Sequence, residues 1–154
     1  MKQQEKDIDY IRNALVLADS AASNGEVPVG AIIVIDDAII AEGANSPIAS
    51  HDPSAHAEII ALRKACAEIR NYRLTDATLY VTLEPCIMCM GAIIHARIKR
   101  LVFGAYDPKT GAAGSCYTIG FDNTLNHQLE ITGGICEMTC GNLLRNFFRE
   151  RRIK

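Results

Sequence analysis

The sequence predicts a mixed α/β fold, with a sheet of about five strands and helices on both of its faces. Three observations lead to this fold class. Segments with helical spacing of apolar residues alternate with strand-like segments along the chain. A strand, a helix and a strand follow one another around Cys86, which indicates a right-handed parallel crossover. The length of 154 residues suits one domain, residues 1–154, with a genuine core.

The first part of the chain predicts a helix followed by a hairpin. Apolar residues recur at helical spacing over residues 8–22, with Asp7 as the expected N-cap and Gly25 as the expected stop. Two apolar strands then lie within residues 29–43, on either side of a tight turn at residues 36–37. This pattern is typical of a hairpin of two strands.

The rest of the chain continues the alternation of helices and strands. A loop rich in turn-forming residues, 44–54, leads into a helix over 55–69, for which Asp52 or Ser54 is the expected cap. The remaining expected elements, in order, are a strand over 77–83, a helix from Pro85 to about Arg97, a strand over 99–106, a glycine-rich loop over 107–115, an unassigned segment over 116–128, a short strand over 129–132 and a helix from about Ile135.

Composition and charge argue against several classes of protein. Hydrophobic residues make up 49% and charged residues 22%, as in ordinary globular proteins, and the net charge of −2 gives no global reason to expect a nucleic-acid partner. The N-terminus lacks the apolar run of a signal peptide, and no apolar stretch is long enough to cross a bilayer. We therefore expect a cytoplasmic protein without membrane association, whose six cysteines are free thiols or metal ligands.

Cys86 and Cys89 form a Cys-x-x-Cys pair at the start of a helix that Pro85 is expected to open. The pair has three interpretations: two buried packing thiols, a redox pair, or part of a metal site. A helix N-terminus stabilises the thiolate that a metal needs. The Ile-Met between the cysteines differs from the Gly-Pro that is usual in thioredoxin-type motifs. A second pair, Cys136 and Cys140, is explained more simply by packing.

His56 is the best candidate for a third metal ligand, because it too stands at the start of a helix. One histidine and two cysteines leave a fourth position for water, which is the ligand number of a catalytic zinc. Glu58 follows two residues later, and a carboxylate beside a metal can take a proton from water. His-x-Glu followed by Pro-Cys-x-x-Cys is the known signature of zinc-dependent nucleobase deaminases.

Four segments, EVPVGAIIV, HDPSAHAEIIALRKA, NYRLTDATLYVTLEPCIMCMGAIIHARIKRLVFGA and DPKTGAAGS, together resemble the bacterial tRNA-specific adenosine deaminases. The resemblance covers nearly the whole chain. It implies a cytidine-deaminase-like three-layer α/β/α sandwich, one zinc ion per subunit and a homodimer with active sites at the subunit interface. The implied reaction converts adenosine to inosine at the wobble position of a tRNA anticodon.

The resemblance also implies roles for individual residues. His56, Cys86 and Cys89 would hold the zinc, and Glu58 would shuttle protons. Asn45 would hydrogen-bond the flipped nucleoside. Asp107 would lie near the anticodon backbone. Further candidate substrate-binding residues are Val29 and, in the C-terminal stretch, Phe148, Arg149 and Arg151.

The C-terminal stretch LLRNFFRERRIK gives an independent indication of an RNA partner. Its arginines could contact phosphates, and Phe147 or Phe148 could stack on an unpaired base. An ordinary amphipathic helix, with leucines and phenylalanines in the core and arginines in solvent, would have the same composition. Together with the resemblance, the stretch predicts that the arginines contact RNA while at least one Phe packs in the core.

Two other functions stay open at this point. A deaminase of a free base or nucleoside, of guanine or cytosine type, would share the zinc site but would have no use for a basic terminal helix. A zinc-stabilised RNA-binding module without catalysis would have no use for Glu58. Of the remaining histidines, we expect His51 in a loop, His95 partly buried and His127 at the surface.

Overall fold

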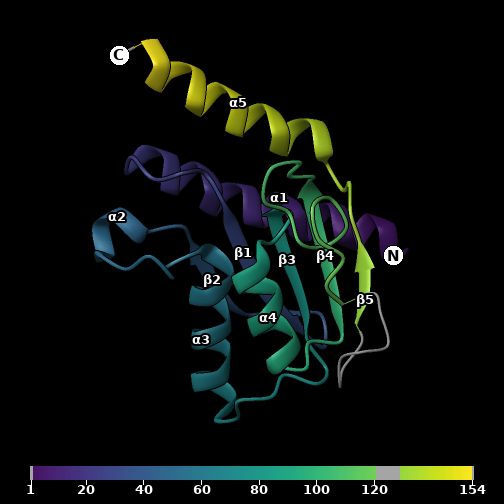
Figure 1. Ribbon diagram of the computed structural model, residues 1–154. Helices are drawn as coiled ribbons and strands as arrows, with labels where there is room; N and C mark the ends of the chain where they lie inside the picture. The colour runs from purple at the N-terminus through teal and green to yellow at the C-terminus, as the bar shows by residue number, and fades with distance from the viewer. Residues whose placement is uncertain (1, 121–128, 154) are drawn as a thin grey trace.

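The computed structural model describes residues 2–120 and 129–153, and it contains one mixed sheet in the order β2-β1-β3-β4-β5 (Figure 1). The strands are β1 Gly30–Ile35, β2 Ala38–Ala44, β3 Thr78–Leu83, β4 Arg100–Ala105 and β5 Glu130–Thr132. The helices are α1 Gln3–Ser23, α2 Pro47–Ser50, α3 Ala57–Ile69, α4 Ile87–His95 and α5 Glu137–Ile153. No helix within these ranges is long and apolar enough to cross a bilayer.

Strand direction decides where the helices begin. β1 is antiparallel to both of its neighbours, β2 and β3, whereas β3, β4 and β5 are parallel to one another. β2 and β3 therefore point the same way, and their carboxyl ends lie at the same edge of the sheet. Because α3 follows β2 and α4 follows β3, the two helices begin side by side at that edge (Figure 1).

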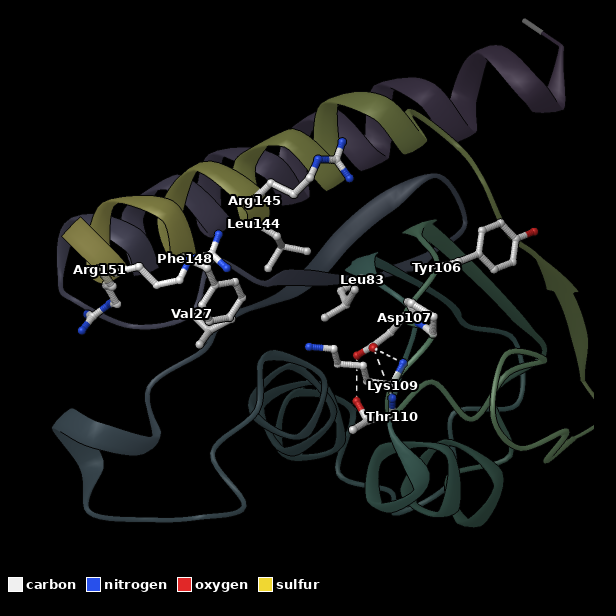
Figure 2. Close-up of a pocket in the computed structure, with 12 residues that line it drawn as sticks. Val27, Leu83, Tyr106, Asp107, Lys109, Thr110, Leu144, Arg145, Phe148 and Arg151 are labelled. Carbon is white, nitrogen blue, oxygen red and sulfur yellow. Dashed lines mark hydrogen bonds between the residues drawn. The ribbon is translucent and has the colours of Figure 1, made fainter. Parts of the chain in front are cut away.

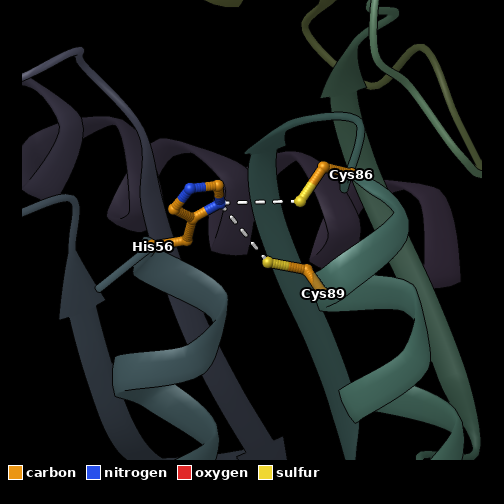
Figure 3. A group of neighbouring side chains, drawn as sticks. All are labelled: His56, Cys86 and Cys89. Carbon is orange, nitrogen blue, oxygen red and sulfur yellow. Dashed lines mark hydrogen bonds between the residues drawn. The ribbon is translucent and has the colours of Figure 1, made fainter. Parts of the chain in front are cut away.

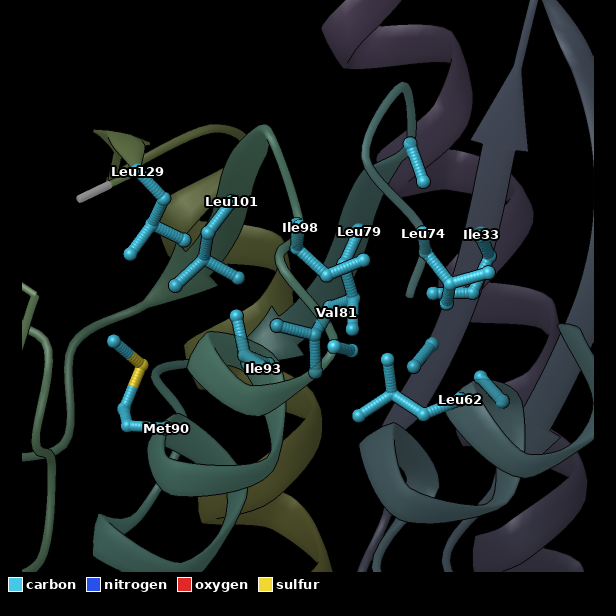
Figure 4. Close-up of a cluster of buried hydrophobic side chains, with 14 of the residues drawn as sticks. Ile33, Leu62, Leu74, Leu79, Val81, Met90, Ile93, Ile98, Leu101 and Leu129 are labelled. Atoms are coloured by element: carbon cyan, nitrogen blue, oxygen red, sulfur yellow. The ribbon is translucent and has the colours of Figure 1, made fainter. Parts of the chain in front are cut away.

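The two faces of the sheet are covered by different helices, as the alternation of side chains along a strand requires. On one face, Ile33 and Leu79 belong to a cluster with the apolar residues of α3 and α4 (Figure 4). On the other face, Ile32 and Tyr80 belong to a cluster with Ile11 of α1 and with α5. The predicted mixed sheet and the three-layer arrangement are thus confirmed.

Gly43 allows α3 to lie very close to the sheet. A Cβ atom at this position would be 2.3 Å from the carbonyl oxygen of Ala57, which is the first residue of α3. Only a residue without a side chain permits this approach. The close contact holds the N-terminus of α3 against β2.

The boundaries of the elements correct several predictions. α1 begins at Gln3 with Lys2 as its N-cap, so the predicted cap Asp7 lies within the helix and is buried. α4 begins at Ile87 with Cys86 as its N-cap, so Pro85 precedes the helix instead of opening it. α2 lies within the segment predicted as a loop. The turn at residues 36–37 is confirmed, since both aspartates have positive φ angles, 51° and 60°.

Asp7 joins α1 to the sheet through a buried ion pair. Its carboxylate accepts hydrogen bonds from Arg100 Nη1 and Nη2, at 2.8 and 2.7 Å, and from the Tyr80 hydroxyl, at 2.8 Å. Burial by itself would raise the pKa of Asp7, but the bonds from Arg100, Tyr80 and Gln3 outweigh it and lower the pKa. Arg100 also donates to Thr132, so one network connects α1 with β3, β4 and β5.

Replacing Asp7 with Asn should lower the free energy of unfolding by about 3–5 kcal/mol, because Arg100 would keep a buried charge without its partner. The same substitution at Asp9, whose ion pair with Arg12 is exposed, should cost less than about 1 kcal/mol. Urea unfolding of both variants at pH 7 measures the two losses. Equal losses would contradict the role assigned to the Asp7–Arg100 pair.

The stabilisation by Asp7 should also depend on pH. Its folded-state pKa lies below the unfolded value of about 3.9. The contribution is therefore complete above the unfolded pKa and is lost as the pH falls through the folded pKa. The difference in unfolding free energy between the parent and Asp7→Asn should shrink only below about pH 4.

Candidate metal centre and active site

The adjacent N-termini of α3 and α4 bring three predicted metal ligands together. His56 is the N-cap residue of α3 and Cys86 is the N-cap residue of α4, while Cys89 lies in the first turn of α4. Figure 3 shows the imidazole of His56 directed across the gap between the helices toward both thiols. Residues 30 positions apart in the chain thus share one site because their strands end at the same edge of the sheet.

The spacing of the three ligand atoms fits a zinc ion. His56 Nδ1 lies 3.6 Å from Cys86 Sγ and 3.6 Å from Cys89 Sγ. A tetrahedral zinc with bonds of about 2.3 Å to sulfur and about 2.0–2.1 Å to nitrogen would place these atoms about 3.5 Å apart. All three atoms lie within 4.8 Å of one another, and they form the one such group among the described residues.

The electrostatic environment favours the thiolate form of Cys86. The hydrogen bond with the Cys89 thiol, against the opposing effect of burial, lowers the pKa of Cys86 to about 4, and His56 adds to this shift. The positive end of the α4 dipole acts in the same direction. Cys86 is therefore ready to bind a metal at neutral pH, because the thiolate is the form that ligates.

Glu58 lies beside the three ligands but is not one of them. It is in the first turn of α3, its exposed fraction is 4%, and its carboxyl interacts with the Cys89 thiol. Burial raises the pKa of Glu58 to about 7. Because burial destabilises the charged form, this carboxyl holds a proton more readily than an exposed one, which suits a group that accepts and passes on protons.

Backbone and side-chain hydrogen bonds connect Val29, through Asn45, to the N-terminus of α3, where His56 stands. Asn45 Oδ1 accepts the backbone N–H of Ala57 at 2.9 Å, so Asn45 caps α3 and lies beside His56. The carbonyl oxygen of Val29 accepts the backbone N–H of Asn45 at 3.0 Å. The side chain of Val29 is 5% exposed and packs in the core, so a contact of this side chain with substrate stays a prediction.

The predicted caps of α3 were wrong. Asp52 Oδ1 accepts the backbone N–H and the hydroxyl of Ser54, at 2.9 and 2.7 Å, so both residues are engaged in a local turn before the helix. The α3 cap comes instead from Asn45, twelve residues before Ala57. A cap from so far away leaves no local signal in the sequence.

A cleft of about 740 Å³ lies between α5 and the loop that begins at Asp107 (Figure 2). Asp107 is at its edge, but its carboxylate accepts the backbone N–H groups of Lys109 and Thr110 and the hydroxyl of Thr110. The carboxylate thus stabilises its own loop. The residues that line the cleft are Val27, Leu83, Tyr106, Asp107, Pro108, Lys109, Thr110, Leu144, Arg145, Phe148, Arg151 and Arg152.

The terminal helix presents its aromatic and basic residues to this cleft and to solvent. Phe148 is 45% exposed, and Arg149 is exposed. Arg151 donates to the carbonyl oxygen of Gly25 and lies 4.5 Å from the ring centre of Phe147, so it ties α5 to the segment after α1. The prediction that a phenylalanine packs in the core was wrong, since neither Phe147 nor Phe148 belongs to a core cluster.

Two buried glutamates that the sequence reading missed hold the segments around the site. Glu26 accepts the backbone N–H groups of Ile48 and Ala49, at 3.1 and 2.8 Å, and so fixes α2 between Asn45 and His56. Glu84 accepts four hydrogen bonds from residues 107–115. In the sequence, the one sign that these glutamates are buried is an apolar neighbour and a nearby proline, in "EVP" and "LEP".

Among the described residues, the other cysteines and histidines do not belong to the metal group. Cys140 is buried between α5 and the sheet, and Cys136 packs against the same cluster, as predicted. His51 is exposed in a turn as expected, whereas His95 is exposed at the end of α4, so its predicted partial burial was wrong. His127 lies outside the described residues.

Comparison with known proteins agrees with this geometry. The family described as "Cytidine and deoxycytidylate deaminase zinc-binding region" matches residues 4–105. The tRNA-specific adenosine deaminase of Haemophilus influenzae is 56% identical over 152 residues, which are 97% of this chain and 87% of that protein. The protein of the same name from Bacillus subtilis is 43% identical over 145 residues, or 94% of this chain and 90% of the relative.

Solved structures agree as well. One from studies of A-to-I editing by tRNA:A34 deaminases has a TM-score of 0.85 and 43% identity, covering 88% of this chain and 99% of that one. A guanine deaminase from Nitrosomonas europaea, with a TM-score of 0.75 and 23% identity over 91% of this chain and 83% of that one, shares the fold alone. A zinc ion fits both the family and the group of His56, Cys86 and Cys89. The chain belongs to the zinc-binding cytidine and deoxycytidylate deaminase family, among its tRNA-specific adenosine deaminases.

Proposed function

We propose that the chain, as a single domain over residues 1–154 acting in the cytoplasm, catalyses hydrolytic deamination of adenosine to inosine at the wobble position of a tRNA anticodon. One observation carries the proposal: the zinc-compatible spacing of His56, Cys86 and Cys89, with the buried carboxyl of Glu58 beside them. The substrate follows from the relatives, which are named tRNA-specific adenosine deaminases at 40–56% identity.

The proposed chemistry divides between the metal and Glu58. A zinc ion held by His56, Cys86 and Cys89 would lower the pKa of a water molecule toward neutrality. Glu58 accepts the proton that the water loses as its oxygen attacks C6 of adenine, and delivers it to the ring nitrogen N1. Glu58 then carries the proton of the new hydroxyl group to the departing amine. Adenosine and water are consumed, and inosine and ammonia are released.

The surroundings of Glu58 and Asn45 suit these roles. Burial of Glu58 limits exchange of its proton with bulk solvent, so the proton taken from water can be delivered to the adenine ring. Asn45 is held at the N-terminus of α3 by its bond to Ala57, which is a rigid position from which to orient the nucleoside. Its contact with the flipped base is part of the proposal.

The cleft beside α5 supports RNA as the partner. Arg145 and Arg152 line it on the α5 side, Lys109 lines it on the loop side, and Phe148 offers an exposed ring for stacking. Cations with an accessible aromatic ring suit a single-stranded loop. A deaminase of a free base needs no such surface outside its catalytic pocket, so this observation favours the tRNA substrate.

We also propose that the active protein is a homodimer. Ile87 and Met88, in the first turn of α4, are 54% and 36% exposed although they lie next to the ligand Cys86. A second copy packed on α4 would bury these side chains and would close the site from one side.

Replacing Glu58 with Gln should reduce kcat by a factor of about 10²–10⁴, because an amide of the same shape cannot accept and return a proton. Bound zinc should stay at the parental level, since Glu58 is not a ligand, and dialysis against a chelator should abolish the activity of the parent. The assay measures inosine in an anticodon stem-loop, with Glu68→Gln, an exposed position on the same helix, as the control. Near-parental turnover by Glu58→Gln would rule out its role.

Replacing both Arg145 and Arg152 with Gln should weaken binding of the stem-loop on the order of tenfold, and should make the slope of log K against log salt shallower by about 1–2. Replacing Arg70 and Arg73 with Gln changes the net charge by the same amount and should leave both quantities unchanged. These arginines lie at and beyond the C-terminus of α3, the end away from His56. Equal effects in the two double variants would show that only the overall charge matters.

Replacing Ile87 with Glu should shift the protein toward monomer, with a dissociation constant higher by at least about tenfold, because a charge would be buried in the interface. Val16→Glu, at an exposed apolar position on α1 (68% exposed), should leave the association unchanged. Sedimentation velocity over a range of concentrations measures both. A dimer of parental strength in Ile87→Glu would exclude α4 from the interface.

A further inference from the structure

Glu84 is a buried carboxylate that the proposed chemistry does not use. It follows β3 directly, two residues before the metal ligand Cys86, and its exposed fraction is 2%. Among the described residues it forms no ion pair with lysine or arginine. A buried carboxylate without a cation must be stabilised by hydrogen-bond donors.

Among the described residues, all four hydrogen-bond donors to the Glu84 carboxylate come from the loop of residues 107–115. One oxygen, Oε1, accepts the backbone N–H of Asp107 at 2.9 Å and the hydroxyl of Ser115 at 2.5 Å. The other, Oε2, accepts the backbone N–H groups of Ala113 and Ser115, each at 3.0 Å. The loop thus wraps around the carboxylate as backbone N–H groups wrap around a bound anion.

The close fit of the loop is visible at Gly111. A Cβ atom there would lie 2.4 Å from Glu84 Cδ and 2.5 Å from Glu84 Oε1. The loop also donates from the backbone N–H of Ala112 to the carbonyl oxygen of Pro85, at 2.8 Å. Two consecutive residues just before the ligand Cys86 therefore hold the loop in place.

The same loop forms one wall of the cleft. Asp107, Lys109 and Thr110 line it opposite Arg145 and Phe148 of α5 (Figure 2). The conformation of the wall depends on Glu84, because Asp107 begins the loop and Ser115 ends it, and both donate to this carboxylate.

We propose that Glu84 is a positioning residue for RNA: its carboxylate fixes the 107–115 loop as a wall of the cleft, at a defined position relative to the metal site. This inference rests on the proposed function for the identity of the ligand. It assigns Glu84 no contact with the reacting atoms. Its loss should therefore change RNA binding much more than the chemical step.

Glu84→Gln tests the proposal, because an amide presents an NH₂ group to donors in either orientation and cannot replace both oxygens. The amide protons of Asp107, Ala113 and Ser115 should exchange with solvent on the order of tenfold faster, since hydrogen bonds to a charged group are lost. The KM for an anticodon stem-loop should rise by about tenfold, while kcat changes by less than about threefold. Bound zinc should stay at the parental level.

Three further variants make the test specific. Ser115→Ala removes one donor and should give a smaller increase in exchange and in KM. Gly111→Ala should reproduce the effects of Glu84→Gln, because the added methyl group displaces the loop from an intact carboxylate. If Glu84→Gln does not fold, Gly111→Ala tests the proposal in its place. Glu68→Gln, an exposed carboxylate on α3, should change neither quantity.

The outcomes separate this inference from the proposed function. Unchanged exchange and KM in both Glu84→Gln and Gly111→Ala would overturn it, as would a loss of zinc in Glu84→Gln with normal loop exchange. If the parent protein does not deaminate the stem-loop, the proposed function fails, while the exchange rates still report whether Glu84 holds the loop.

Discussion

The site depends on one constraint of the sheet: β1 lies antiparallel between β2 and β3, so these two strands end at the same edge. The helices that follow them therefore begin side by side. Their N-cap residues, His56 and Cys86, belong to the group that fits a zinc ion, and the dipole of α4 favours the thiolate form of Cys86. The fold thus supplies both the position of the metal site and part of its electrostatics.

Buried carboxylates hold the parts of the chain that the sheet cannot order. Asp7 joins α1 to three strands through Arg100, Tyr80 and Thr132. Glu26 fixes α2, and Glu84 fixes the loop along the cleft. Glu58 has a different role, since its carboxyl faces the metal ligands instead of a loop. A buried carboxylate without hydrogen-bond partners would raise the free energy of the folded state. Each of these groups therefore favours the one arrangement of its surroundings that supplies its partners.

The predictions that failed have different physical causes. Asp7 and Asp52 had the local pattern of helix caps, but the first is paired with a strand far along the chain and the second forms a turn. At least one of Phe147 and Phe148 was expected in the core, yet Phe148 is exposed and Phe147 is half-buried with Arg151 over its ring. A distant contact thus decided the partner of Asp7, whereas Asp52 and Phe147 contact near neighbours in the chain, Ser54 and Arg151.

The sequence by itself determined the alternation of helices and strands through local periodicity. It indicated the three candidate metal ligands and the adjacent glutamate through two short motifs, His-x-Glu and Pro-Cys-x-x-Cys, which together match a known signature. The tertiary structure decided which distant groups meet: Asn45 with the N-terminus of α3, Glu84 with the loop of residues 107–115, and Arg151 with Gly25. These contacts join segments whose distance in space is set by strand order and direction. A pattern of neighbouring residues cannot encode that distance, since packing of the whole chain fixes it.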